Sequence, residues 1–306
     1  MTAPSPPTDP FPNQVSADWL AAHLQDPHVV IVDCRFSLAD PHLGQRQYAE
    51  GHIPGAHYLD LNQDLSSPVQ RHGGRHPLPN WDTFCQHLEA IGVCSASSHG
   101  PTQVVVYDDS RFAFAARLWW MLKYLGHDAV AVLDGGWGAW QRGGYAVSTE
   151  IPTAAPEPQA GPFIPQFQPG WIVDVEDIRR SQHHPGVRLI DSREPARYRG
   201  EVEPVDPVAG HIPGASNQCW QEVSTAEGFL KPVADHVQRW ASLRDFPDRD
   251  APEPIVYCGS GVTACVNLLS QAIANQPLAK LYVGGWSDWC SYEASECPRE
   301  PDGTSV

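Results

Sequence analysis

GHIPGA, residues 51–56, recurs letter for letter at residues 210–215. The blocks around this hexapeptide also recur in the same order, for example LDGGW at 133–137 and YVGGW at 282–286. Matching blocks lie about 150 to 160 residues apart, a period far too long for a solenoid repeat. The sequence therefore predicts two tandem copies of one globular domain.

Strand and helix signals alternate through both copies. The short apolar runs at 104–107 and 255–257 are each followed by a longer amphipathic stretch, at 114–125 and 262–274. Such alternation is typical of parallel strands joined by helices. We therefore expect an α/β fold of two tandem domains, each with a parallel sheet flanked by helices on both faces.

Proline content marks the expected domain boundary. Residues 148–169 carry a proline roughly every third or fourth position, which disfavours helix and sheet and indicates an extended, semi-rigid linker. We expect the first domain over 13–147 and the second over 170–298. The proline-rich residues 1–12 are expected to be disordered, and 299–306 to form a C-terminal tail.

Composition excludes several classes of function. With 306 residues and 42% hydrophobic content, the chain can bury a core in each of two domains. Its formal net charge of −16 leaves no basic surplus for nucleic acid or an anionic membrane, so we expect neither as a partner. The N-terminus lacks the charged and apolar regions of an export signal, which predicts a cytoplasmic protein. The eight cysteines include no C-x-x-C pair, and we expect no metal and no cofactor.

Cys258 ends the second copy's strand and opens the loop CGSGVT, residues 258–263. Two glycines in a tight loop before a helix allow several backbone N–H groups to turn inward and hold an anion. Such donors lower the pKa of a thiol and make it a nucleophile at neutral pH. The matching residue of the first copy is Asp108, so the copies share a fold but not a reaction. The alternative is that Cys258 is a buried structural thiol at a strand end.

The strand, cysteine and loop, together with the two GHIPGA blocks, resemble the two-domain rhodanese family. CGSGVTA at 258–264 resembles its 3-mercaptopyruvate sulfurtransferase branch. The resemblance implies an enzyme whose cysteine takes sulfane sulfur from a small-molecule donor and becomes a persulfide. It then passes the sulfur to cyanide, a thiol or a thioredoxin-like protein. The family's first copy is catalytically silent, which agrees with Asp108.

The residues after the cysteine indicate the donor. In the thiosulfate-using branch these positions resemble Arg-Lys, whereas Gly259 and Ser260 are uncharged, so the resemblance favours 3-mercaptopyruvate or a related thiol acid. Arg197 matches the family's substrate-binding arginine, and a guanidinium can bind a carboxylate through two parallel hydrogen bonds. The second family arginine is missing, because Val205 stands in its place. We therefore expect weaker mercaptopyruvate affinity or a different acid donor.

The resemblance also implies a serine relay. Ser260 matches the family serine and His76 its histidine, while the position of the aspartate is Asn62, whose amide can orient an imidazole but cannot stabilise its charge. Alternatively, His76 is an exposed loop histidine. The predicted catalytic residues are Cys258, Ser260 and His76. The predicted substrate-binding residues are Arg197, Gly259, Gly261, Val262, Thr263 and Asn62.

Three other functions remain to be weighed. Phosphatases that share this fold need an arginine six positions after the cysteine, and that position is Ala264, which argues against a phosphatase. Thiosulfate sulfurtransferase is the second choice of enzyme. A persulfide carrier or binding module without turnover is the non-enzymatic alternative.

Overall fold

The computed structural model describes residues 11–96, 100–152, 161–181, 187–241 and 254–300, and within them the chain forms two compact units. Unit 1 takes the chain up to Ser66, Pro79–Gln168 and Ala226–Phe229. Unit 2 takes Ser67–Leu78, Pro169–Thr225 and the chain from Leu230 onward. The predicted disorder over 1–10, the centre of the predicted linker at 153–160 and the tail beyond 300 lie outside the described residues.

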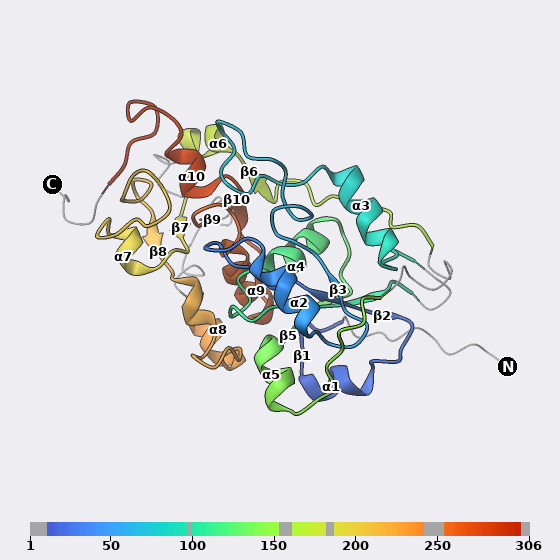
Figure 1. The fold of residues 1–306 in the computed structure, drawn as a ribbon. Coiled ribbons are helices and arrows are strands. Elements are labelled where there is room, and N and C mark those ends of the chain that lie inside the picture. Colours follow the sequence, from blue (N-terminus) through green and yellow to red (C-terminus); the bar gives the residue numbers. More distant parts are fainter. Residues whose placement is uncertain (1–10, 97–99, 153–160, 182–186, 242–253, 301–306) are drawn as a thin grey trace. The chain divides into compact units, whose positions relative to one another are not determined.

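Unit 1 contains one five-stranded sheet in which every strand pair is parallel, in the order β1-β5-β4-β2-β3 (Figure 1). Its strands are β1 (Gln14–Val15), β2 (Val29–Asp33), β3 (His57–Tyr58), β4 (Gln103–Tyr107) and β5 (Val130–Leu133). Its helices are α1 (Ala17–Ala22), α2 (Leu43–Glu50), α3 (Trp81–Ala90), α4 (Ala115–Tyr124) and α5 (Gly136–Arg142).

Unit 2 repeats this plan, with parallel strands in the order β6-β10-β9-β7-β8. Its strands are β6 (Ile172–Val173), β7 (Leu189–Asp191), β8 (Ser216–Asn217), β9 (Ile255–Tyr257) and β10 (Lys280–Tyr282). Its helices are α6 (Val175–Ser181), α7 (Pro195–Tyr198), the 3₁₀ helix η1 (Trp220–Val223), α8 (Val233–Arg239), α9 (Ala264–Ile273) and α10 (Gly285–Trp289).

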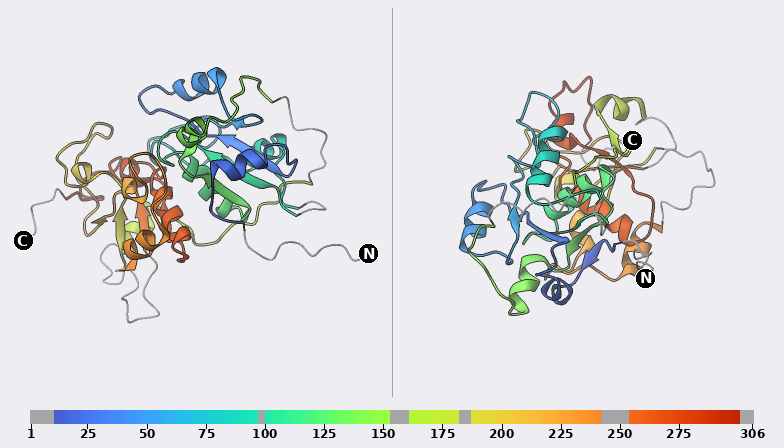
Figure 2. Two further views of the ribbon diagram at one scale, coloured as in Figure 1. Left: turned by 90° about the horizontal axis from the view of Figure 1, so that it is seen from below. Right: turned by 90° about the vertical axis from the view of Figure 1, so that its right-hand side faces the viewer.

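Helices flank each sheet, so the predicted α/β fold with two tandem domains is confirmed (Figures 1 and 2). The apolar runs form the central strands. A parallel strand that is covered by helices on both faces has no side exposed to solvent, so all of its residues can be apolar. Val104, Val105 and Val106 of β4 are fully buried, as is Val256 of β9. None of the described helices is long and apolar enough to span a bilayer.

The repeated hexapeptide is anchored in the same way in each unit. In unit 1 the N–H of Ile53 donates to the hydroxyl oxygen of Tyr107 at 3.3 Å, and in unit 2 Ile212 donates to Tyr257 at 3.2 Å. Burial and the neighbouring aspartate raise the pKa of both tyrosines well above the usual value, which keeps both hydroxyls neutral. The repeat therefore fixes each loop to the strand that precedes Asp108 in unit 1 and Cys258 in unit 2.

A buried arginine holds the start of each hexapeptide. Arg193 binds both carboxylate oxygens of Asp191 and donates from Nη2 to the carbonyl oxygen of Gly210 at 2.7 Å. Arg35 makes the same contacts with both carboxylate oxygens of Asp33 in unit 1, and its Nη2 donates to the carbonyl oxygen of Gly51 at 2.7 Å. Because the same contacts recur in the copy that has Asp108 in the position of Cys258, they serve the fold rather than the reaction.

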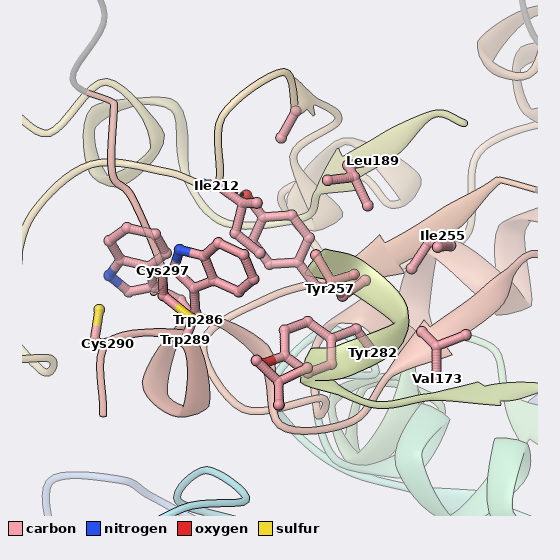
Figure 3. Close-up of a cluster of buried hydrophobic side chains, with 13 residues drawn as sticks. Val173, Leu189, Ile212, Ile255, Tyr257, Tyr282, Trp286, Trp289, Cys290 and Cys297 are labelled. Atoms are coloured by element: carbon pink, nitrogen blue, oxygen red, sulfur yellow. Dashed lines mark hydrogen bonds between the residues drawn. The ribbon is translucent and has the colours of Figure 1, made fainter. Parts of the chain in front are cut away.

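The core of unit 2 contains aromatic side chains from the strand and the helix next to the cysteine loop. Tyr257 is the residue before Cys258, and Tyr282, Trp286 and Trp289 belong to the same cluster as Tyr257 (Figure 3). All four aromatic residues are fully buried. Rings of this size pack with little freedom to move, so the end of β9 has a rigid support.

The sequence did not predict how segments are shared between the units. Residues Ser67–Leu78, which stand in the first copy, belong to unit 2, and Ala226–Phe229 belong to unit 1. The described ends of the predicted linker also pack on unit 1, since Ser148 pairs with His52 and Gln166 donates its N–H to the carbonyl oxygen of Leu125. The buried side chain of Phe163 and these backbone bonds hold the ends as part of the domain.

Candidate active site

Cys258 lies immediately after β9 and is only 2% exposed. Its carbonyl oxygen accepts the N–H of Trp286 at 2.8 Å, and the carbonyl oxygen of Gly259 accepts the N–H of Ser287 at 2.8 Å. Gly285 has a φ of +60°, and a methyl group on its Cα would lie 2.6 Å from the carbonyl oxygen of Cys258. Glycine is needed there because the two loops approach so closely.

The matching loop of unit 1 holds a carboxylate. Asp108 is 2% exposed, and its Oδ1 accepts the N–H groups of Ser110 at 2.9 Å and Phe112 at 3.0 Å. Its Oδ2 accepts the N–H groups of Phe114 and Ala115, both at 2.9 Å. Four inward N–H groups therefore bind a carboxyl group at this position of the fold, where burial raises its pKa and these hydrogen bonds oppose that shift.

The unit 2 loop places the corresponding backbone donors after Cys258. They belong to Ser260, Val262, Ala264 and Cys265. Cys265 donates its N–H to the carbonyl oxygen of Val262 at 3.1 Å, whereas the N–H groups of the other three have no acceptor in the described part of the chain. The Cys258 sulfur receives no hydrogen bond from the described residues, so these donors can serve an anion attached to it.

The predicted loop residues follow Cys258 as a run of bends and a turn that leads into α9. Gly259, Gly261 and Val262 are buried, and Thr263 is partly buried at the start of α9. Gly261 has a φ of +69°, and a methyl group there would collide with the carbonyl oxygen of Val283. The glycine pattern thus follows from backbone geometry, while binding of substrate by this loop stays a prediction.

Two members of the predicted relay meet. Nδ1 of His76 and Oγ of Ser260 share a hydrogen bond of 2.7 Å, and both residues are at most 5% exposed. His76 belongs to unit 2 through the segment Ser67–Leu78, and it is buried rather than exposed. Asn62 lies in unit 1, where its N–H donates to Oδ1 of Asp60 at 2.7 Å, and its role in the relay stays a prediction.

Arg197 lies near the loop but is already paired with carboxylates. Its Nη2 donates to Oε1 of Glu203 at 2.7 Å and to Oδ2 of Asp206 at 3.2 Å. Burial opposes the charge of Glu203, yet hydrogen bonds from Arg197 and from the Asp206 N–H lower its pKa overall. For Asp206 burial dominates and raises the pKa, although Arg75 and Arg197 oppose that shift.

Arg75 and Asp206 are the residues of this site that sequence reasoning missed. Arg75 forms an ion pair with Asp206, and a methyl group on Gly259 would lie 2.8 Å from its Nη2. The RHGGRH run at 71–76 signalled charge, but nothing in it indicated that the segment would pack beside a loop so distant in sequence. Within the described ranges no cluster of histidine, cysteine or carboxylate side chains is arranged to hold a metal ion.

Comparison with known proteins identifies the family. The Rhodanese-like domain profile matches residues 16–143 and 174–292. A Pseudomonas aeruginosa protein named "Probable 3-mercaptopyruvate sulfurtransferase" is 43% identical over 293 residues, covering 95% of this chain and 97% of the relative. The 3-mercaptopyruvate sulfurtransferase of Escherichia coli K12 is 37% identical over 295 residues, covering 94% of this chain and 97% of the relative.

A solved structure agrees over a similar span. The crystal structure of SseA from Escherichia coli, a 3-mercaptopyruvate sulfotransferase with the rhodanese fold, matches with a TM-score of 0.72 at 35% identity. The match covers 90% of this chain and 99% of the SseA chain. Both copies of the repeat therefore have counterparts in proteins of known family, and the chain belongs to the rhodanese-like domain family as a tandem, two-domain member.

Proposed function

We propose that this chain is a sulfurtransferase that moves sulfane sulfur from 3-mercaptopyruvate, or a related thiol acid, to a thiophilic acceptor through a persulfide on Cys258. The observation that carries the proposal is the contrast between the two copies. In unit 1 four N–H groups bind the Asp108 carboxylate, and in unit 2 the same position is a cysteine. The names of the two relatives support the choice of donor.

The first half-reaction makes the persulfide. The Cys258 thiolate attacks the donor sulfur and forms an S–S bond, while the carbon–sulfur bond of mercaptopyruvate breaks. The electron pair of that bond passes to the carbon fragment as the enolate of pyruvate, which takes up one proton to give pyruvate. The donor thiol loses its own proton, so the outer sulfur is left as a persulfide anion. Backbone N–H groups at the end of β9 then stabilise the outer, negatively charged sulfur.

The second half-reaction regenerates the thiolate. A nucleophilic acceptor attacks the outer sulfur, the S–S bond breaks, and its electron pair returns to Cys258. Cyanide gives thiocyanate, and a thiolate gives a new persulfide. We propose a cytoplasmic location and a small thiol or a thioredoxin-like protein as acceptor, because reducing conditions keep such thiols available. All eight cysteines of the chain are free in the structure, which fits that environment.

Ser260 and His76 supply the proton path. The hydroxyl group of Ser260 is two residues from the sulfur nucleophile and is hydrogen-bonded to Nδ1 of His76. We propose that the Ser260 hydroxyl group donates the proton that the enolate takes up, and that His76 exchanges protons with Oγ of Ser260. Arg197 is assigned to the donor carboxylate, which a charged fork recognises.

His76→Ala is expected to lower kcat with mercaptopyruvate about a hundredfold, a typical contribution of a positioned proton-transfer group. Ser260→Ala should have a similar effect. Because the two act as one unit, the double variant should be little worse than either single variant. A double-mutant cycle on kcat checks this, and independent, additive losses would show that the 2.7 Å hydrogen bond has no role in the reaction.

The donor is tested by measuring sulfur release from mercaptopyruvate and from thiosulfate side by side. We expect kcat/KM for mercaptopyruvate to exceed that for thiosulfate, because Gly259 and Ser260 provide no charge for a dianion. A higher value with thiosulfate would make the chain a thiosulfate sulfurtransferase. Persulfide on Cys258 with negligible turnover of both donors would make it a carrier.

A further inference from the structure

Arg75 places a second guanidinium beside the cysteine loop. A methyl group on Gly259, the residue next to Cys258, would lie 2.8 Å from Nη2 of Arg75 and 3.6 Å from Nη2 of Arg197. Both guanidinium groups therefore face the backbone adjacent to the sulfur nucleophile. The sequence had indicated one arginine here and a missing partner at Val205.

The backbone of the Ser67–Leu78 segment is fixed to α10 (Figure 1). Oγ of Ser287 accepts the N–H of Arg75 at 3.1 Å, and the N–H of Ser287 holds the carbonyl oxygen of Gly259. The buried Asp288 accepts the N–H of Gly73 at 2.7 Å. One short helix thus positions both Arg75 and the cysteine loop, so their spacing does not depend on a long flexible loop.

The two arginines differ in how many of their guanidinium N–H donors are already hydrogen-bonded. Arg197 uses Nε and Nη2 on Glu203 and Nη2 again on Asp206, and its Nη1 lies 3.9 Å from Glu194. Arg75 donates only from Nη1, to Asp206, and its buried Nε has no acceptor within the described residues. The unused Nη2 is the atom that points at Gly259.

Asp206 shows that the two guanidinium groups can share a carboxylate. Its Oδ1 pairs with Arg75 and its Oδ2 with Arg197, and its side chain is 2% exposed. The two guanidinium groups are therefore spaced so that one carboxylate can bind both, and in this structure that carboxylate is Asp206 of the protein itself.

We propose that Arg75, together with Arg197, binds the carboxylate of the sulfur donor and takes the place of the arginine that is absent at Val205. The inference rests on the proposed function and assigns its donor site to a segment of the first copy. Asp206 acts as a positioning residue that keeps both guanidinium groups in place. Substrates are then thiol acids whose carboxylate is separated from the sulfur by a short carbon chain.

The test measures binding without turnover. Calorimetry gives the Kd of 3-mercaptopyruvate for Cys258→Ser, and for the same protein with Arg75→Ala or Arg75→Lys added. Arg75→Ala should weaken binding about 10- to 100-fold, the loss of one charge-assisted hydrogen-bonding partner. Arg75→Lys keeps the charge but not the fork, so its Kd should fall between the two. Arg71→Ala, in the same segment but exposed, should leave the Kd unchanged.

A second pair of variants separates substrate binding from a structural role. If the only role of Arg75 is to neutralise Asp206, then Arg75→Ala leaves the Kd of mercaptopyruvate unchanged in a protein that already carries Asp206→Asn. We expect instead that Arg75→Ala still weakens binding at least tenfold in the Asp206→Asn background. An unchanged Kd there overturns the inference, as does a parent variant that does not bind mercaptopyruvate. Failure of the proposed function can be told apart from failure of this inference, because the function is tested by sulfur release from the wild-type protein and the inference by binding to the variants.

Discussion

Cys258→Ser lowers the rate of sulfur release from mercaptopyruvate at least about a thousandfold, the largest effect expected of any single change on activity. A serine hydroxyl is almost fully protonated at neutral pH and cannot form a persulfide. The substituted residue is about the same size and lies at the end of β9, so unfolding is not the expected cause. Coupled measurement of pyruvate formation checks this result.

Cys85→Ser is the matched control. Cys85 lies in α3 of unit 1 and is partly exposed, and burial and nearby carboxylates raise its pKa, which keeps it a thiol near neutral pH. Its replacement should leave sulfur release within about twofold of wild type. Comparable losses in the two variants would mean that thiol content in general, rather than Cys258, sets the rate.

Arg193→Met lowers the free energy of unfolding of unit 2 by about 3–5 kcal/mol, the largest stability effect expected. The substitution leaves the fully buried Asp191 carboxylate without the guanidinium that binds both its oxygens, and an unpaired buried charge is costly. Burial opposes the charge of Arg193, but Asp191 raises its pKa overall, so the arginine is charged in the folded protein.

Urea unfolding followed by a probe in each unit measures this loss. Arg35→Met removes the same contacts in unit 1 and should destabilise that unit by a similar amount, without removing any group near Cys258. A loss below about 1 kcal/mol in both variants would contradict the assignment of these pairs to the fold. A loss in only one unit would show that the two copies are anchored differently.

Sequence reasoning predicted the features that depend on local pattern. The apolar runs before Asp33 and Asp108 could be identified as strands because strands buried on both faces need continuous apolar residues. The position of Cys258 followed from the same argument, since the loop after a parallel strand and before a helix has a defined geometry. The repeat doubled each signal, so the fold class could be inferred and Cys258 could be proposed as the nucleophile.

Features that depend on packing between distant segments could not be predicted. Arg75 stands in the first copy, and no periodicity or motif indicates that its segment joins unit 2. For the same reason, Val205 in the sequence predicted that one arginine contact with the substrate is missing. The structure nevertheless places the guanidinium of Arg75 beside Gly259. His76 was predicted as a relay residue only through the family resemblance. Its burial beside Ser260 depends on the packing of the Ser67–Leu78 segment in unit 2, which no local pattern indicates.

The most direct test of the account is the mass of the Cys258 peptide after the protein is incubated with mercaptopyruvate in the absence of acceptor. We expect that peptide to gain the mass of one sulfur atom and to lose it again when cyanide is added. Sulfur on a different cysteine, or no added sulfur while pyruvate is still formed, would contradict the claim that Cys258 carries the transferred atom.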